Sequence, residues 1–300
     1  MDRLDGMRVF VAVADAGGFA AAARRLDLSP PAVTRAVAMV EDRVGARLLH
    51  RTTRLVRLTE AGTRFLEDCR RILAEVEEAE AAAAGLHGEP RGLVSITAPV
   101  LFGRLHVAPI LFDIGQQQPK ITVRGFFVDR IVGLAEEGYD IAVRIAHLPD
   151  SNLSAIRVGA VRRVVCASPG YLAARGTPTR LADLAGHDAV PFTQGAGPRE
   201  WTFHMPDGGT ETVTPTARLI VNQADVAVAA AVAGRGLTRV MSYQMAAEHQ
   251  AGRLQVILEE FEPPPVPIHV VHQEGRRTSA RVRAVVDFLV DRLRADPALR

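Results

Sequence analysis

Apolar residues near the start of the chain recur at helical spacing, and short turn signals divide them into three helices. The first helix places Leu4, Met7, Phe10, Val11 and Ala14 on one face. Gly17 and Gly18 end it, and residues 19–26 form a short second helix. Ser29 suits the N-cap of a third helix because its hydroxyl accepts a backbone N–H, and Pro30 loses no helix hydrogen bond in the first turn. Two short helices joined by a tight turn predict a helix-turn-helix.

The third helix, expected at about residues 31–44, has two contrasting faces. Its apolar stripe comprises Val33, Ala36, Val37, Val40 and Val44, and its opposite face carries Thr34, Arg35, Ala38, Glu41 and Asp42. In a helix-turn-helix the N-terminal residues of this helix meet base edges in the major groove, so Thr34 and Arg35 are candidate DNA contacts. Thr34 could equally be a surface hydroxyl, and Arg35 a phosphate contact that carries no sequence information.

Two short strand-like segments follow, at residues 47–51 and 55–58. They predict a β-wing in which Arg51, Arg54 and Arg57 are available to phosphates or to a minor groove. Small three-helix domains also serve as protein-interaction modules, and the pattern alone leaves that alternative open.

A long helix is expected next, over about residues 60–89. Thr59 suits its N-cap, and the segment from Gly85 to Gly92, which contains Pro90, ends it. Its apolar seam repeats every three or four residues and comprises Phe65, Cys69, Ile72, Val76, Ala79 and Ala83. Such a seam predicts pairing with a second copy of the helix, the alternative being a single helix packed on its own domain. Cys69 is interpreted as a small core residue rather than a redox switch.

After Gly92 the pattern alternates between short strands and helices. Strands are expected at residues 93–97, 121–126, 140–145, 162–167, 189–192, 217–221 and 266–272. Helices are expected at residues 105–115, 130–137, 171–175, 181–184 and 225–233, and from about residue 279 onward. This alternation predicts a mainly parallel sheet covered by helices.

Charge is distributed unevenly along the 300 residues. The net charge is only +2, but residues 1–59 hold ten arginines and six acidic residues, whereas residues 60–90 hold three arginines and eight acidic residues. A basic block followed by an acidic helix favours a nucleic-acid-binding module on a helical connector, although chance clustering could produce it. The arginine excess itself is uninformative, because 35 of the 36 basic residues are arginine throughout the chain.

Other classes of protein are disfavoured by simple features. The apolar runs are too short to cross a membrane, the start does not resemble a signal peptide, and two cysteines make no disulfide framework, so we expect a cytoplasmic protein. No nucleophile elbow, phosphate-binding loop or zinc-binding helix motif is present. His269 and His272 would point to opposite faces of their strand. We therefore expect neither an enzyme nor a metal or other cofactor.

The first 62 residues closely resemble the opening of LysR-type transcriptional regulators. The matching stretches are residues 10–26 with Gly17-Gly18-Phe19, residues 28–35 with Leu28-Ser29-Pro30-Pro31, residues 40–49, and residues 51–62 with Arg51-Thr52-Thr53-Arg54. The resemblance implies a winged helix-turn-helix in which Ser29, Pro30, Pro31, Thr34 and Arg35 face the groove and Arg51 and Arg54 belong to the wing. It also implies that the long helix dimerises, here through Phe65, Cys69, Ile72 and Val76. Pro30 departs from the family, which often has glutamine there, and proline cannot hydrogen-bond a base edge.

The remainder resembles the effector-binding domain of the same family, in Ala98-Pro99-x-x-Phe102-Gly103, in residues 137–144 and in residues 162–172. The resemblance implies an α/β fold like that of periplasmic binding proteins, with one subdomain at about residues 92–161 and 267–300 and a second at about 162–266. The expected domains are thus residues 1–59, 60–89 and 90–300. A small-molecule effector, anionic or aromatic, would bind in the cleft between the subdomains.

The expected effector contacts follow the ends of strands, where open α/β sheets bind ligands. They are Thr97, Ala98, Pro99, Val100, Phe126, Val128, Arg144, Thr193, Asn222 and Arg239. The turn before Val100 begins a helix whose free N–H groups suit an anion, although ordinary helix capping would explain these residues too. Arg144 could instead form a salt bridge with Asp140, Asp129 or another acid. Arg239 replaces an apolar residue of the family, and either marks an anionic ligand or turns outward to solvent.

The resulting prediction is a regulator that binds a pseudo-palindromic promoter site on double-stranded DNA as a homodimer or homotetramer and responds to its effector. Two alternatives are a plain solute-binding protein and a degenerate regulator, suggested by Pro30, that dimerises but reads DNA poorly.

Overall fold

The structure is a computed structural model that describes residues 2–51, 56–83, 89–134, 136–193, 200–273 and 279–299. The chain divides into two compact units, Met1–Leu93 and Val94–Arg300, and each is described by itself. In the described part of the chain, no helix combines the length and apolarity needed to cross a membrane.

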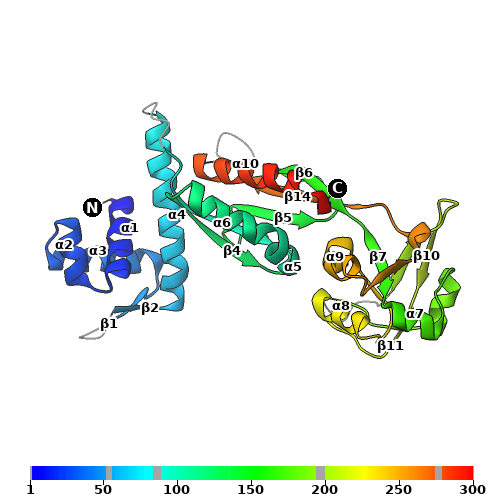
Figure 1. The fold of residues 1–300 in the computed structure, drawn as a ribbon. Coiled ribbons are helices and arrows are strands. Elements are labelled where there is room, and N and C mark those ends of the chain that lie inside the picture. The colour runs from blue at the N-terminus through cyan, green and yellow to red at the C-terminus, as the bar shows by residue number, and fades with distance from the viewer. Residues whose placement is uncertain are drawn as a thin grey trace. The chain divides into compact units, whose positions relative to one another are not determined.

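The first unit contains the three predicted helices, two short strands and the predicted long helix (Figure 1). These are α1 (Arg3–Ala16), α2 (Phe19–Leu26), α3 (Pro30–Val44), β1 (Leu49–Arg51), β2 (Val56–Leu58) and α4 (Glu60–Ala83). Helices α1 and α3 end at Gly17 and Gly45, whose φ angles of 65° and 72° are left-handed and favour glycine. Ser29 caps α3 as expected, with its Oγ 3.4 Å from the backbone N–H of Ala32. The sequence pattern therefore located the ends of these helices well, because glycine and the Ser-Pro turn mark them.

The core of this unit joins α1, α2 and α3 to the first half of α4. Its fully buried side chains include Phe10, Val13, Val33, Val37 and Leu48. The residue expected on the α4 seam, Cys69, is fully buried in this same core.

The second unit begins with a five-stranded sheet (Figure 1). Its strands are β3 (Gly92–Ala98), β4 (Ile121–Phe127), β5 (Ile141–Ile145), β6 (Leu153–Val161) and β14 (Val266–Gln273), in the order β4-β3-β5-β14-β6. Strands β3 and β5 are parallel, but β14 is antiparallel to both β5 and β6. The expectation of a mainly parallel sheet is thus wrong, because β14 inserts antiparallel between two strands from the first part of the unit.

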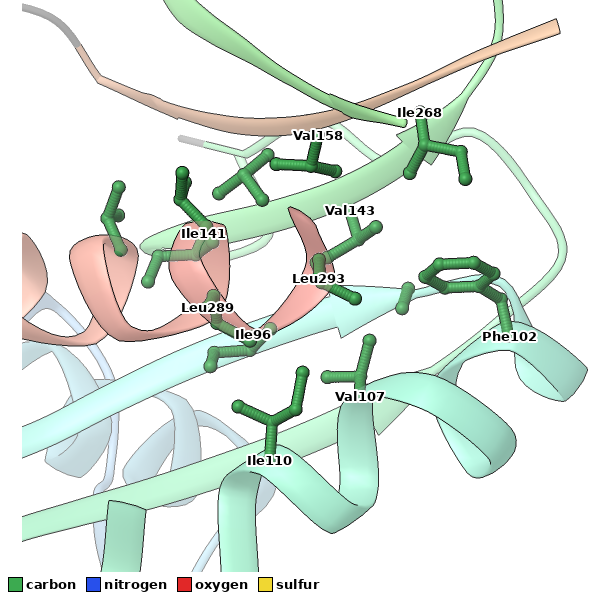
Figure 2. Close-up of a cluster of buried hydrophobic side chains, with 14 of the residues drawn as sticks. Ile96, Phe102, Val107, Ile110, Ile141, Val143, Val158, Ile268, Leu289 and Leu293 are labelled. Carbon is green, nitrogen blue, oxygen red and sulfur yellow. The ribbon is translucent and has the colours of Figure 1, made fainter. Parts of the chain in front are cut away.

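Helices cover one face of this sheet and form its core (Figure 2). They are α5 (Val100–Phe102), the π-helical turn η1 (Gly103–Val107), α6 (Ala108–Gln117) and α10 (Ala280–Ala295), followed by η4 (Pro297–Leu299). In Figure 2, Val107 and Ile110 approach Ile96 of the sheet, and Leu289 and Leu293 of α10 pack nearby. All six residues of the predicted apolar face of the last helix are buried, which confirms that face: Val282, Val285, Val286, Leu289, Val290 and Leu293.

A second, three-stranded sheet of order β12-β7-β13 is entirely antiparallel. Its strands are β7 (Arg163–Ala167), β12 (Thr238–Met241) and β13 (Gln255–Ile257). One face packs against α8 (Ala224–Val232) and α9 (Ser242–Gln250). The other face packs against α7 (Pro169–Arg175), η2 (Leu181–Gly186), η3 (Glu259–Phe261) and the hairpin of β9 (Trp201–His204) and β10 (Thr210–Val213). Strands β8 (Asp188–Ala189) and β11 (Thr216–Ala217) form a small parallel pair.

The described residues of the segment 130–137 do not form the expected helix. The described residues there form turns, in which Val132 and Leu134 are buried whereas Ile131 is 91% exposed. Ion pairing between Arg130 and Glu137 joins the two ends of the segment. The apolar residues therefore anchor a loop against the sheet, and their spacing only mimicked one face of a helix.

Candidate DNA-contacting and ligand-binding residues

The N-terminal end of α3 presents the predicted DNA-contacting residues to solvent. Pro30, Pro31, Thr34 and Arg35 are all exposed, and so is the capping residue Ser29. The Thr34 hydroxyl donates to the carbonyl of Pro30 at 3.0 Å, which leaves the oxygen able to accept a hydrogen bond from a base. The backbone of α3 thus fixes where these side chains lie, and their polar groups point away from the core.

Glu41 is the exception on this helix, because it was expected on the polar face and is only 4% exposed. Its carboxylate accepts the backbone N–H groups of Leu48 and Leu49 at 2.9 and 3.2 Å, and the guanidinium of Arg47 donates to it at 3.2 Å. These bonds tie the end of α3 to the start of the wing. Conversely, Val44 was expected in the apolar stripe but is 42% exposed, because α3 ends there beyond the core.

The wing is an antiparallel pair in which His50 of β1 lies opposite Arg57 of β2. Arg57 is exposed, as a phosphate contact requires. Arg51 ends β1, but its side chain lies outside the described part, and Arg54 falls outside the described residues altogether.

The seam expected on α4 divides into two parts. Phe65 and Cys69 pack into the core of the first unit, where the Phe65 ring centroid lies 5.5 Å from that of Phe10. Burial, with a smaller contribution from Asp68, raises the pKa of the Cys69 thiol to about 12. The expectation that Cys69 lies on a dimer seam is thus corrected, because a single chain already encloses it completely. Ile72 and Val76, further along α4, are only half-buried.

The start of α5 was expected to offer free N–H groups to an anion. Thr97 and Ala98 are buried there, and Pro99 and Val100 are half-buried. The backbone N–H of Val100, however, already donates to the carboxylate of Asp129 at 2.9 Å. The anion at this helix end is thus a side chain of the protein itself.

Strand β4 carries two further expected contacts. Val128, just beyond its end, donates its backbone N–H to Ala98 at 2.9 Å, so these two residues are brought together. Phe126 is exposed, and its ring stacks on that of Tyr139 with centroids 6.2 Å apart.

Arg144 does not pair with Asp140 or Asp129, and its expected contact with an effector stays a prediction. Its guanidinium donates to the backbone carbonyl of Val132 at 2.6 Å. The two acids suggested as its partners accept backbone N–H groups instead. Asp129 accepts that of Val100, and Asp140 accepts that of Ser95 at 2.7 Å.

Two turns of the second half of this unit are joined in the structure. Phe192 and Val221 form an isolated parallel bridge, and the N–H of Thr193 donates to the carbonyl of Val221 at 3.0 Å. Thr193 is half-buried and Asn222 is exposed. The two predicted contacts therefore lie on adjacent chain segments.

Arg239 lies on the face of the three-stranded sheet that packs against the β9–β10 hairpin. It pairs with Val165, and its guanidinium lies 4.8 Å from the ring centroid of Phe203 and donates to the carbonyl of Thr202 at 2.5 Å. Burial and the nearby Arg163 lower its pKa to about 10. Arg239 therefore packs against the hairpin rather than turning outward to solvent, and helices α8 and α9 pack on the opposite face.

The sequence did not predict one contact region within the second unit, where the segment from Phe102 to His106 meets helices α8 and α9. The Phe102 ring lies edge-on to Tyr243 of α9 with centroids 5.3 Å apart, and His106 bonds Asp296 at 2.8 Å between Nδ1 and Oδ2. Tyr243 and Ala224 belong to the core of the five-stranded sheet, although they come from α9 and α8. Arg104 adds an ion pair to Asp225 at 3.8 Å. No periodic pattern signals this contact region, because single residues of separate segments form it.

The described residues contain no cluster of histidine, cysteine, aspartate or glutamate able to hold a metal ion.

Comparison with known proteins gives consistent results over the whole chain. Residues 4–63 match the family model described as bacterial regulatory helix-turn-helix protein, lysR family, and residues 87–294 match the LysR substrate binding domain. An HTH-type transcriptional regulator of Xanthomonas campestris is 36% identical over 98% of this chain and 86% of its own length. The HTH-type transcriptional repressor PA14_22550 of Pseudomonas aeruginosa is 30% identical over 100% of this chain and 95% of its own. The structure of CrgA, a LysR-type transcriptional regulator from Neisseria meningitidis, is 29% identical, with a TM-score of 0.61 over 96% of this chain and 98% of that chain.

Proposed function

The chain belongs to the LysR family of transcriptional regulators, and from this membership we propose that it binds a promoter site as a homodimer or homotetramer and responds to a small-molecule effector. The family comprises regulators, not enzymes. The observation that carries the proposal is the exposed N-terminal end of α3, which holds Thr34 and Arg35 outside the core of a helix-turn-helix.

In this proposal, Thr34 and Arg35 contact base edges in the major groove. Ser29, Pro30 and Pro31 bring the helix end against the DNA, and the wing residues Arg51, Arg54 and Arg57 contact phosphates or the adjacent minor groove. Proline has no N–H, so Pro30 contributes shape rather than hydrogen bonding, and base discrimination depends on the next turn of the helix.

Pairing of two chains would give two copies of α3 and therefore a pseudo-palindromic site, with half-sites about 34 Å or a multiple of it apart. Ile72 and Val76, the half-buried part of the α4 seam, are the residues proposed to pair. A cytoplasmic location, on the chromosome, is part of the same proposal.

The effector is proposed to bind between the subdomains at residues 92–161 with 267–300 and at residues 162–266. Backbone hydrogen bonds bring predicted contacts together in each subdomain, which supports this proposal. The N–H of Val128 donates to the carbonyl of Ala98 in the first subdomain, and the N–H of Thr193 donates to the carbonyl of Val221, next to Asn222, in the second. The exposed, stacked ring of Phe126 favours an aromatic effector. Thr97, Pro99 and Val100 complete the proposed contacts. Effector binding would have to favour one arrangement of the subdomains over another in order to change how the paired domains bind DNA.

A mobility-shift titration on the intergenic DNA beside the gene tests the proposal. The full-length protein should retard this DNA at low salt, and affinity should fall steeply as salt rises, because phosphate contacts release counterions. Arg35→Ala and Thr34→Ala should weaken binding, whereas Arg64→Ala, which removes an exposed arginine on α4, should not. A folded dimer that fails to retard the DNA would contradict the regulator proposal, and retardation of all sequences alike would indicate the degenerate regulator.

A further inference from the structure

Three basic side chains form a cross-strand row on the five-stranded sheet. His269 of β14 lies opposite Arg144 of β5 on one side and Arg157 of β6 on the other. Val143 and Val270, which alternate with them along the strands, belong to the core on the helix-covered face. Because successive residues of a strand point to opposite faces, the three basic side chains share the other face. Cross-strand neighbours have Cβ atoms about 5 Å apart, so each guanidinium can reach the position of His269.

Within the described residues, no acidic side chain balances this row. Arg144 is satisfied by a backbone carbonyl, that of Val132. Arg157 is exposed, and its backbone carbonyl accepts the guanidinium of Arg294 of α10 at 3.0 Å, so its own side chain stays free of that contact. The Nδ1 atom of His269 is buried and has no hydrogen-bond partner.

Without a bound anion, the electrostatic interactions among the three basic side chains are therefore unfavourable. Burial lowers the pKa of His269, nearby Arg157 and His147 lower it further, and a hydrogen bond to the backbone of Ala146 partly offsets them by raising it. The two guanidinium groups flank a ring whose buried Nδ1 has no partner among the described residues, and like charges on neighbouring strands destabilise a sheet. An anion bound at the row would reduce both costs.

We propose that Arg144, His269 and Arg157 form a binding site for a small oxyanion, either phosphate or a dicarboxylate. Guanidinium groups present forked N–H donors whose geometry matches the oxygens of both anions. The exposed side chain of Arg157 leaves the row open to solvent. A bound anion would counteract the lowered pKa of His269, and the protonated ring could then donate from Nδ1. The site is separate from the N-terminus of α5, where Asp129 is already bound. It goes beyond the proposed function, which places the effector between the subdomains, whereas this row lies on neighbouring strands of the five-stranded sheet.

Calorimetric titration of the full-length protein tests this site. The probes are inorganic phosphate and malonate, each at an ionic strength held constant with sodium chloride. We expect saturable binding of one anion per chain, and the tighter probe identifies the class. Arg157→Met should weaken that binding about tenfold or more, because a hydrogen bond to a charged group is lost. Arg157→Lys, which keeps the charge but not the forked donor, should bind with intermediate affinity.

The matched control is Arg235→Met. Arg235 is an exposed arginine of the same unit, just after α8, and its removal should leave the affinity within about twofold of the wild type, as is usual for exposed charges. His269→Gln is a second variant. It should weaken anion binding more at pH 6 than at higher pH, because the wild-type imidazole is protonated more at pH 6.

Absence of saturable binding to either probe would overturn the proposal, and so would equal affinities of Arg157→Met and the wild type. Mobility shifts in a chloride buffer without phosphate or carboxylates report on the DNA-binding function separately, so the two proposals fail independently.

Discussion

The buried carboxylate of Glu41 should determine how firmly the wing is held against α3. Glu41→Gln keeps the size of the side chain but removes the charge, and it replaces one acceptor oxygen with an NH₂ donor that faces another donor. A hydrogen bond to a charged group contributes about 1.5–3 kcal/mol, and the carboxylate receives two backbone N–H groups and one guanidinium. We therefore expect the substitution to lower the free energy of opening at this junction by about 2–4 kcal/mol.

Native-state hydrogen exchange measures this effect directly. The amides of Leu48 and Leu49 donate to Glu41, so their exchange in Glu41→Gln should accelerate by about 30- to 1,000-fold if local opening controls it. Amides within α1 should change less, because they do not depend on the junction. A wing that is loosely held should also lose phosphate contacts, which would flatten the salt dependence of DNA binding.

Asp42→Asn is the matched control. Asp42 is the next residue on the same helix, and it is exposed, so the substitution removes the same charge near the DNA without touching the wing. If Glu41→Gln and Asp42→Asn had equal effects on the exchange of Leu48 and Leu49, the reasoning would be refuted.

Three further predictions follow from individual environments. Burial raises the pKa of the Cys69 and Cys166 thiols to about 12, so neither should react with dithionitrobenzoate at pH 8 until urea unfolds the protein; rapid labelling of the native protein would contradict this. Gly62→Ala would place a Cβ 1.9 Å from the carbonyl oxygen of Leu48 and should cost about 3 kcal/mol in urea unfolding, whereas Gly115→Ala, with open space around it, should be neutral or slightly stabilising. Burial lowers the pKa of His269 in the folded state, so the unfolded chain binds more protons, and stability should fall as the pH drops through the ordinary value of 6.5. His269→Gln should flatten that decline, and an unchanged slope would show that other groups cause it.

The helices of the first unit could be predicted almost to the residue, because each boundary has a local signal. Gly17, Ser29 and Gly45 act through backbone conformation or capping, and such effects depend on neighbouring residues alone. The burial of Glu41 could not be predicted in this way. Its partners are the amides of a strand seven and eight residues later, and helical periodicity places it on the polar face.

The second unit shows the same division between local and distant causes. The apolar face of α10 was identified correctly, because a core helix carries its own periodic pattern. The segment at residues 130–137 resembled a helix, but Asp129 and the Arg130–Glu137 ion pair hold it as turns against the sheet. Arg239 was recognised as unusual from the sequence, yet its contacts with Thr202 and Phe203 depend on a hairpin whose position no local signal reveals.

The bond between Asp129 and the N-terminus of α5 has a consequence for any ligand that approaches this helix end. A carboxylate carried by the same chain is a tethered competitor, with an effective concentration of roughly millimolar or more. An incoming anion must therefore exchange with it rather than simply add, and the exchange would release the loop that begins at Asp129. A neutral ligand would not have to displace Asp129 and would leave the loop in place. The charge of a ligand would therefore determine whether its binding changes the structure beyond the residues that it contacts.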